Sequence, residues 1–166
     1  MTVRVQEDDF DIGAEIAALT DGDTDIGAVV TFTGTVRGAA KGQPIIAMSL
    51  EHYPGMTERE LERVEAEAQE RWPLSGSLIV HRHGDLKPGD NIVLVVTASA
   101  HRQAAFDAAQ FLMDFLKTNA PFWKKETGRE GQGEWVDARE SGTDALDRWR
   151  RGGGSVAAHT SDGVDR

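Results

Sequence analysis

Lys117 and Lys124 lie on either side of Pro121 and are the residues best suited to chemistry in this sequence. Three aromatic residues could form an apolar wall beside these lysines: Phe115, Phe122 and Trp123. A lysine next to such a wall and a second cation has its charged form disfavoured, which suits it to proton transfer or nucleophilic attack. Spacing alone favours a plainer interpretation, in which Lys117 interacts with the dipole at a helix C-terminus and Lys124 is a surface charge.

A second group of cations could bind an anion. His101 and Arg102 follow Ser99, a residue that can cap a helix N-terminus. Cations in the first turn of a helix oppose its dipole, so either an anionic ligand or a nearby carboxylate is expected to compensate them. Arg37 and Lys41, in a Gly-rich loop, could close over the same anion or could form a solvated hairpin tip.

Three histidines allow a metal site to be drawn. His81 and His83 would share one face of a strand, and His52 lies on another strand. A histidine pair without a carboxylate or a fixed third ligand is a weak pattern. We therefore predict neither a bound metal nor a cofactor.

The composition limits the classes of protein and of chemistry. The chain has 28 acidic and 18 basic residues and a net charge of −10, so neither a nucleic-acid binder nor an anionic-membrane binder is expected. It has no cysteine, which excludes disulfides, thiolate metal ligands and an enzyme-borne persulfide. No run of about 18 apolar residues occurs, and the first residues do not resemble a targeting segment, which predicts a cytoplasmic protein.

A central helix is expected to position the candidate groups. Apolar residues recur at the spacing of one helical face, at Ala105, Ala109, Leu112 and Leu116. This pattern predicts a helix that ends before Pro121 and is followed by extended residues 122–126. The two lysines would then meet where the helix ends, and His101 and Arg102 would lie at its far end.

The rest of the chain alternates between strand and helix patterns. Strands are predicted at residues 3–5, 26–36, 45–53, 77–83, 91–99 and 134–138, and further helices at residues 11–20, 57–72 and 144–150. Paired strands with helices between them predict an α+β fold with a mainly antiparallel or mixed sheet. We expect one domain over residues 1–150 and a disordered tail at residues 151–166.

Two of these elements carry more detailed predictions. Residues 26–36 are too apolar for a strand with one wet face, so this strand is expected to be central and to form a long hairpin with residues 45–53. Thr57 and Glu60 stand at capping-box spacing at the start of the second helix, and Glu65 is expected on its solvated side.

Several segments together resemble one family, the large, catalytic subunit of molybdopterin synthase. The most specific stretches are Ser99-Ala-His-Arg102 and Ala120-Pro-Phe-Trp-Lys124. Further matching stretches are Gly27-Ala-Val-Val-Thr-Phe-Thr-Gly34, Leu50-Glu-His-Tyr-Pro-Gly-Met-Thr57 and Ala138-Arg-Glu-Ser141. They occur in the family's order and cover residues 3–149.

The resemblance implies an α/β hammerhead-type fold and a homodimer within a heterotetramer. Each protomer would bind a small ubiquitin-like sulfur-carrier subunit whose C-terminal Gly-Gly is activated as a thiocarboxylate. The carrier's sulfur would be transferred, twice, to cyclic pyranopterin monophosphate to form the dithiolene of molybdopterin. A chain without cysteine fits this expectation, because the sulfur must come from a partner.

The resemblance also implies residue roles. Lys117 and Lys124 match the family's catalytic lysines, whose individual roles the sequence does not separate. The phosphate and the pterin would be bound by four further residues, Arg37, His101, Arg102 and Arg139, with contributions across the dimer interface. The chain departs from the family at Asn119, where a basic residue is common, and in its tail after Trp149.

Two other functions stay open on the sequence alone. One is a non-catalytic module that accepts a peptide C-terminus by strand addition or in a backbone nest. The other is a histidine metalloenzyme.

Overall fold

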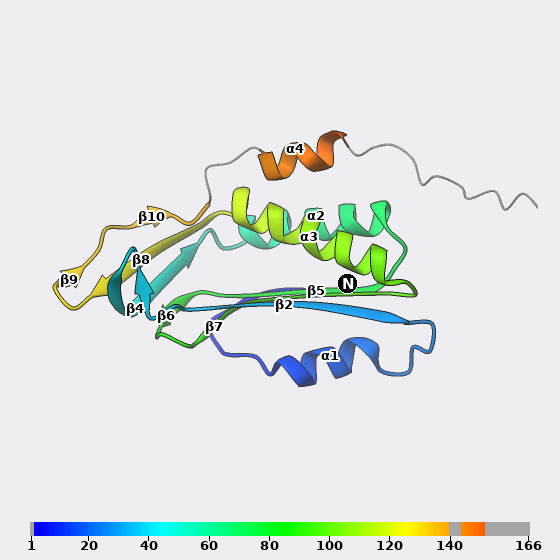
Figure 1. The fold of residues 1–166 in the computed structure, drawn as a ribbon, viewed down its shortest axis with the longest axis horizontal. Coiled ribbons are helices and arrows are strands. Elements are labelled where there is room, and N and C mark those ends of the chain that lie inside the picture. Colours follow the sequence, from blue (N-terminus) through cyan, green and yellow to red (C-terminus); the bar gives the residue numbers. More distant parts are fainter. Residues whose placement is uncertain (1, 140–143, 152–166) are drawn as a thin grey trace, which may run out of the picture.

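The computed structural model describes residues 2–139 and 144–151. Its elements form layers, with helices on both faces of a first sheet and a second sheet beside it (Figure 1). Of the tail predicted at residues 151–166, Arg151 is the last residue of a helix, and residues 152–166 lie outside the described part of the chain.

The first sheet is mixed and has the strand order β1-β5-β7-β2. These strands are β1 (Thr2–Gln6), β2 (Ala28–Thr35), β5 (Leu74–Arg82) and β7 (Asn91–Ser99). β1 pairs with β5 in parallel, whereas the β5–β7 and β7–β2 pairs are antiparallel. Helices cover both faces of β5 and β7, which explains why both strands are apolar along most of their length.

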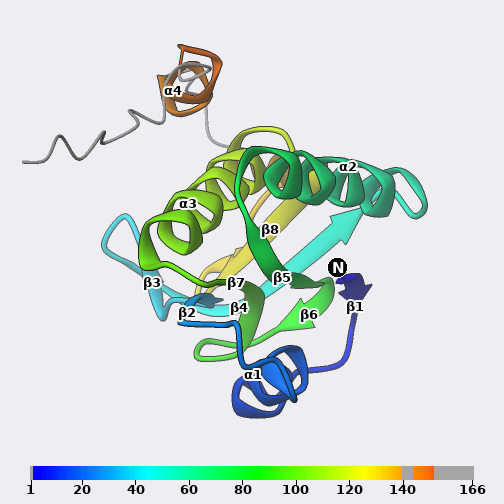
Figure 2. The ribbon, with the colours of Figure 1, turned by 90° about the vertical axis from the view of Figure 1, so that its right-hand side faces the viewer.

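The helices form the outer layers (Figure 2). α1 (Ile12–Thr20) covers one face of the first sheet, and α2 (Met56–Arg71) and α3 (Arg102–Thr118) cover the other. α4 (Asp144–Arg151) packs on the outside of α3. In the part of the chain that the structure describes, no helix is both long enough and apolar enough to cross a membrane.

The second sheet is antiparallel and follows the order β10-β8-β4-β3, with β6 paired to β4 and β9 paired to β8. Its strands are β3 (Ala39–Ala40), β4 (Gln43–His52), β6 (Gly84–Leu86), β8 (Phe122–Gly128), β9 (Gly131–Gln132) and β10 (Val136–Asp137). The β4–β8 pair places Leu50 opposite Lys124 and His52 opposite Phe122. The predicted strands 45–53, 122–126 and 134–138 are thus present, the last of them shortened.

Two predictions about β2 are wrong. β2 is an edge strand with Val29 and Phe32 exposed, and it pairs with β7 rather than with β4. The chain between β2 and β4 forms its own hairpin, because Lys41 and Gly42 take positive φ angles of 50° and 76° between β3 and β4. This turn sends β4 into the second sheet.

The start of α2 also differs from the prediction. Gly55 is the N-cap, and its N–H donates to Glu58 Oε2 at 2.6 Å. The Thr57 hydroxyl instead donates to the carbonyl oxygen of Tyr53 at 3.0 Å. The capping box predicted at Thr57 and Glu60 is therefore wrong, because the helix begins earlier along the chain.

Glu65 is buried rather than solvated, with 1% of its surface exposed. Its Oε1 accepts hydrogen bonds from Ser77 Oγ at 2.6 Å and from the Thr2 backbone N–H at 3.1 Å. Burial raises the pKa of this carboxyl group above its usual value. Glu65 thus joins α2 to β5 and β1, which periodicity within one helix does not reveal.

Candidate active site

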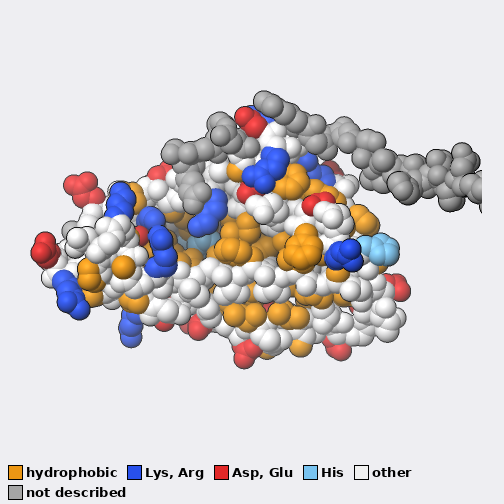
Figure 3. Space-filling view, in the orientation of Figure 1, with side chains coloured by type: hydrophobic (Ala, Val, Ile, Leu, Met, Phe, Trp, Pro, Cys, Tyr) orange, Lys and Arg blue, Asp and Glu red, His pale blue; other side chains and the backbone are white. Residues whose placement is uncertain are grey.

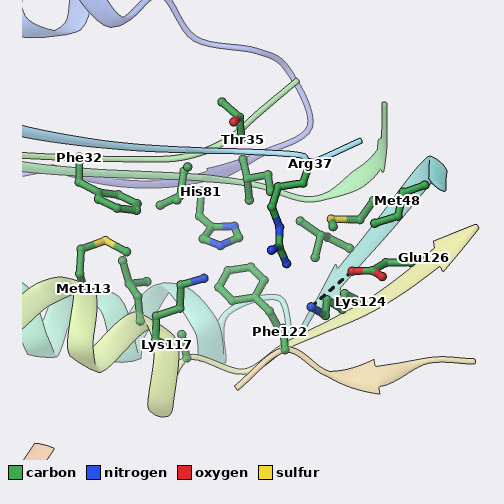
Figure 4. A pocket seen from close by; sticks show the side chains of 18 residues that line it. Phe32, Thr35, Arg37, Met48, His81, Met113, Lys117, Phe122, Lys124 and Glu126 are labelled. Atoms are coloured by element: carbon green, nitrogen blue, oxygen red, sulfur yellow. Dashed lines mark ion pairs between the residues drawn. The ribbon is translucent and has the colours of Figure 1, made fainter. Parts of the chain in front are cut away.

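A pocket of about 180 Å³ lies where the C-terminal end of α3 meets both sheets (Figure 4). The side of the first sheet contributes Phe32, Gly34, Thr35, Arg37, His81, Ile92 and Val93. The second sheet contributes Ile45, Met48, Leu50, Phe122, Lys124 and Glu126, and the remaining lining is Met113, Leu116, Lys117, Ala120 and Ala138. The walls are therefore mainly apolar, and three cations line the pocket with a single carboxylate.

Lys117 reaches the pocket from the last turn of α3. The predicted apolar face of this helix is buried, at Ala105, Ala109, Leu112 and Leu116. This burial fixes the rotation of α3 about its axis. The helix ends at Thr118, ahead of Pro121, as predicted, and the Asn119 N–H donates to the Phe115 carbonyl at 2.8 Å. Lys117 is thus carried to the pocket by a helix whose pattern and end the sequence predicts.

Lys124 enters the pocket from β8. Alternation along the strand places Phe122, Lys124 and Glu126 on the face that lines the pocket. Lys124 Nζ lies 3.5 Å from Glu126 Oε1, and the Lys124 side chain is 35% exposed. Lys124 therefore has a carboxylate partner within the same strand.

Arg37 lies just beyond the end of β2 and is the third cation of the pocket. Figure 4 shows its guanidinium reaching between His81 and Lys124. Close packing is required here, because a Cβ on Gly34 would stand 2.8 Å from Val93 Cγ1. A side chain at residue 34 would therefore force the Val93 side chain, or the strands themselves, to shift at the pocket.

His81 is a pocket residue that the sequence suggested only as a metal ligand. Its ring stacks on Phe122 with centroids 3.7 Å apart, and its Nδ1 lies 2.8 Å from the Arg82 carbonyl oxygen. Burial lowers the pKa of His81 to about 4, and the positive charge of Lys117 also lowers it. The alternation of side chains along β5 could have identified His81 as a pocket residue, because it directs His81 to the same side of the sheet as the buried Ile79.

The three histidines considered as metal ligands do lie near one another. The rings of His52 and His83 have centroids 4.6 Å apart, and both are close enough to His81 to influence its charge. Within residues 2–139 and 144–151, no group of three or more His, Cys, Asp or Glu side chains is arranged to hold a metal ion.

The other predicted binding residues are not in this pocket. His101 and Arg102 are exposed at the opposite end of α3, and at 1.5 Å per helical residue Arg102 lies roughly 22 Å from Lys117 along the helix. His101 is the N-cap, because Ser99 instead ends β7 and donates its hydroxyl hydrogen to the Pro73 carbonyl at 2.8 Å. Arg139 follows the pocket residue Ala138, but its Nε donates to Asp137 at 2.9 Å.

Three further residues named from the sequence, Lys41, Phe115 and Trp123, also do not line the pocket. Of the predicted aromatic wall, Phe122 alone lines it. Figure 3 shows Lys and Arg side chains gathered above the junction of the two sheets, beside a band of hydrophobic side chains. A local basic region therefore exists on a chain whose net charge is −10.

Comparison with known proteins relates this arrangement to one family. The family model of the MoaE protein matches residues 5–119. The chain belongs to the MoaE family. A molybdopterin synthase catalytic subunit of Mesorhizobium japonicum is 59% identical over 150 residues, which are 90% of this chain and 93% of the relative.

Solved structures agree with this assignment to the MoaE family. The molybdopterin biosynthesis MoaE protein of Burkholderia ambifaria has a TM-score of 0.79 and 53% identity, covering 90% of this chain and 97% of that one. Molybdopterin synthase of Staphylococcus aureus has a TM-score of 0.72 and 32% identity, covering 80% and 95% of the two chains. The predicted α+β, hammerhead-type fold is confirmed, and the relatives that carry it are catalytic subunits of an enzyme of molybdenum cofactor biosynthesis.

Proposed function

We propose that this chain transfers sulfur from the C-terminal thiocarboxylate of a small carrier subunit to cyclic pyranopterin monophosphate, forming the dithiolene of molybdopterin. The observation that carries the proposal is the convergence of Lys117, Lys124 and Arg37 on one pocket. The names of the MoaE relatives support the same activity.

The charges of the two ligands fit this pocket. The carrier tail is anionic through its thiocarboxylate, and the precursor is anionic through its phosphate. Cations in an apolar pocket interact with such anions more strongly than cations in water do. Because the chain has no cysteine, sulfur enters the pocket on the carrier.

Each lysine has a role in this proposal. Lys117 lies at the thiocarboxylate and assists attack and proton transfer, while Lys124 stabilises developing negative charge and orients the pterin. The Glu126 carboxylate, whose Oε1 lies 3.5 Å from Lys124 Nζ, partly offsets the positive charge of Lys124 before a ligand arrives. The reverse assignment of the two lysines predicts the same pocket.

The remaining binding residues require a second protomer. We assign His101 and Arg102, at the far end of α3, to the pocket of the partner in a homodimer, itself part of a heterotetramer with two carriers. Arg37 then binds the phosphate from the same protomer. Arg139 can contribute to binding of the precursor only if its guanidinium leaves Asp137. The reaction is expected to take place in the cytoplasm.

A pure binding module is the competing proposal. Such a module would hold the carrier tail without transferring its sulfur, and charge removal in the pocket would alter affinity alone. Membership of a family of catalytic subunits favours the enzyme.

Neighbouring lysines on β8 test the proposal. Lys124→Ala is expected to slow molybdopterin formation from thiocarboxylated carrier and precursor by about 10²- to 10³-fold, because one stabilising charge is removed. Lys125→Ala is the matched control, since Lys125 lies over Trp135 outside the pocket, and it should keep near wild-type rates. Single-turnover rates and carrier affinity are measured for both. Full activity in Lys124→Ala would refute the role of Lys124, and a loss of affinity alone would support the binding module.

A further inference from the structure

His81 is held in the pocket by two fixed contacts. One face of its ring stacks on Phe122, with an interplanar angle of 17°. Its Nδ1 lies 2.8 Å from the Arg82 carbonyl oxygen, which can only accept a hydrogen bond. Nδ1 therefore carries the hydrogen, and the orientation of the ring is set by both β5 and β8.

The other ring nitrogen is then a bare acceptor. The low pKa of His81, about 4, keeps the ring neutral near pH 7, so Nε2 has a free lone pair. Among the residues that the structure describes, none donates a hydrogen bond to Nε2. His81 is 9% exposed, and Nε2 keeps access to the pocket, which also contains charged donors. A donor that reaches Nε2 there can give it a hydrogen bond.

Lys117 is the donor best placed for this nitrogen. Figure 4 shows its amine pointing from α3 toward the His81 ring, and its charge acts on the pKa of His81. We propose that His81 is a positioning residue for Lys117, whose ammonium donates a hydrogen bond to Nε2 once the carrier tail is in the pocket. This inference rests on the proposed function, because it gives Lys117 a fixed direction toward the thiocarboxylate.

A neutral acceptor suits this task better than a carboxylate does. A carboxylate would neutralise the charge of the lysine that must attract an anionic tail, whereas an imidazole orients the ammonium and leaves the charge in place. Burial is the main reason that His81 stays neutral, and the charges of Lys117 from α3, His52 from β4 and His83 beyond β5 lower its pKa further. Arg37, beyond β2, also reaches toward the ring. Lys124, held by Glu126, illustrates the alternative within the same pocket.

The contact is tested directly by ¹⁵N NMR of the histidine rings. The sample is the full chain in complex with the carboxylate form of its carrier. In Lys117→Met, the Nε2 resonance of His81 should move toward that of an unbonded imine nitrogen, and in the matched variant Arg37→Met it should stay close to its wild-type position. An unchanged resonance in Lys117→Met, or a shift in Arg37→Met alone, would overturn the proposal.

The effect on the reaction is tested with three substitutions of His81. His81→Phe keeps the stacked ring, His81→Asn keeps a donor near the Nδ1 position, and His81→Gln places an amide near the Nε2 position. The first two should slow single-turnover sulfur transfer by about 10- to 100-fold, as expected for losing one hydrogen bond to a charged group, without weakening carrier binding. His81→Gln should restore most of the rate, and His83→Gln serves as the control outside the pocket. Equal rates in Gln and Phe variants would contradict the positioning role.

The two measurements separate this inference from the proposed function. If the NMR shift occurs but Lys117→Ala transfers sulfur normally, the positioning of Lys117 stands and its role in the reaction is lost. If Lys117→Ala is inactive but the shift is absent, the proposed function stands and the role of His81 is refuted.

Discussion

The two ends of α3 differ in what surrounds their cations. At the C-terminal end, Lys117 lines a pocket together with Arg37 and Lys124. At the N-terminal end, His101 and Arg102 are exposed, and the first turn contains no acidic residue. The first end is built by contacts within one chain, whereas the second is left with charges that the helix dipole disfavours.

This difference indicates where each end acts. Cations that line an apolar pocket are suited to stabilise charge during a reaction. Cations on an exposed helix start are suited to bind an anion brought by another molecule, and roughly 22 Å of helix keeps them from the pocket of their own chain. In the homodimer that we propose, one helix would serve two pockets.

The largest expected effect compares one substitution at each end. Lys117→Ala should lower the single-turnover rate of sulfur transfer by about 10²- to 10³-fold with carrier affinity retained. Arg102→Ala should mainly raise KM for the pterin precursor, because it removes the contact to the phosphate that we propose. Rate and KM measurements on both variants check this, and equal kinetic defects at the two ends would contradict the division of roles.

Mixing the two variants tests whether the ends act in different pockets. In dimers formed by co-expressing Lys117→Ala and Arg102→Ala, one pocket of each mixed dimer receives intact residues from both chains if Arg102 acts across the interface. At precursor concentrations well below the KM of Arg102→Ala, random pairing should then give roughly a quarter of wild-type activity. If Arg102 acts on its own pocket, every pocket carries a substitution, and the mixture will be no more active than its separate components.

The sequence predicted the C-terminal end of α3 well. The apolar spacing of Ala105 to Leu116 and the stop before Pro121 are local signals, and they place Lys117 where the structure has it. The extended residues after Pro121 likewise follow from local rules that also place Lys124.

Other features depend on partners that are distant along the chain. β2 looked central because its residues are too apolar for a strand with one wet face, but β2 is an edge strand, and the β3–β4 turn separates it from β4. Glu65 looked solvated because its partners, Ser77 and the Thr2 amide, come from other elements. His81 was missed as a pocket residue because its stacking partner, Phe122, lies on β8.

Low pH should lower the free energy of unfolding through His81, in the pocket at the C-terminal end of α3. The usual pKa of histidine, 6.5, falls to about 4 for folded His81. The contribution of the neutral ring to the free energy of unfolding is complete above pH 6.5 and is lost as pH falls toward 4. The loss at pH 4 is about 3 kcal/mol, since each tenfold change in an equilibrium constant is worth 1.36 kcal/mol. Denaturant unfolding at pH 7 and pH 4 should show a smaller decrease in His81→Phe than in wild type. His101→Gln, at the exposed end, should keep the wild-type decrease; a decrease in His81→Phe as large as in wild type would exclude His81 as its source.

The smallest effect concerns the contact of α4 with the C-terminal half of α3. Trp149 Nε1 of α4 donates to Asp114 Oδ2 at 2.7 Å, and its ring packs edge-on against Phe111. Trp149→Phe should lower the free energy of unfolding by about 1–2 kcal/mol, because a buried carboxylate loses one donor. Urea denaturation measures the change. Phe106→Ala is the matched aromatic control on the exposed side of α3 and should change stability less.

The pocket lies at the seam between two sheets, with His81 on one and Lys124 on the other. Its width is therefore set by the distance between two separately hydrogen-bonded bodies. A ligand that contacts both sheets will restrict their motion relative to each other. The amide hydrogens of β5 and of β8 should therefore both exchange more slowly when the pocket is filled. Ligand binding would then bring the reacting groups together and, at the same time, make the two sheets more rigid.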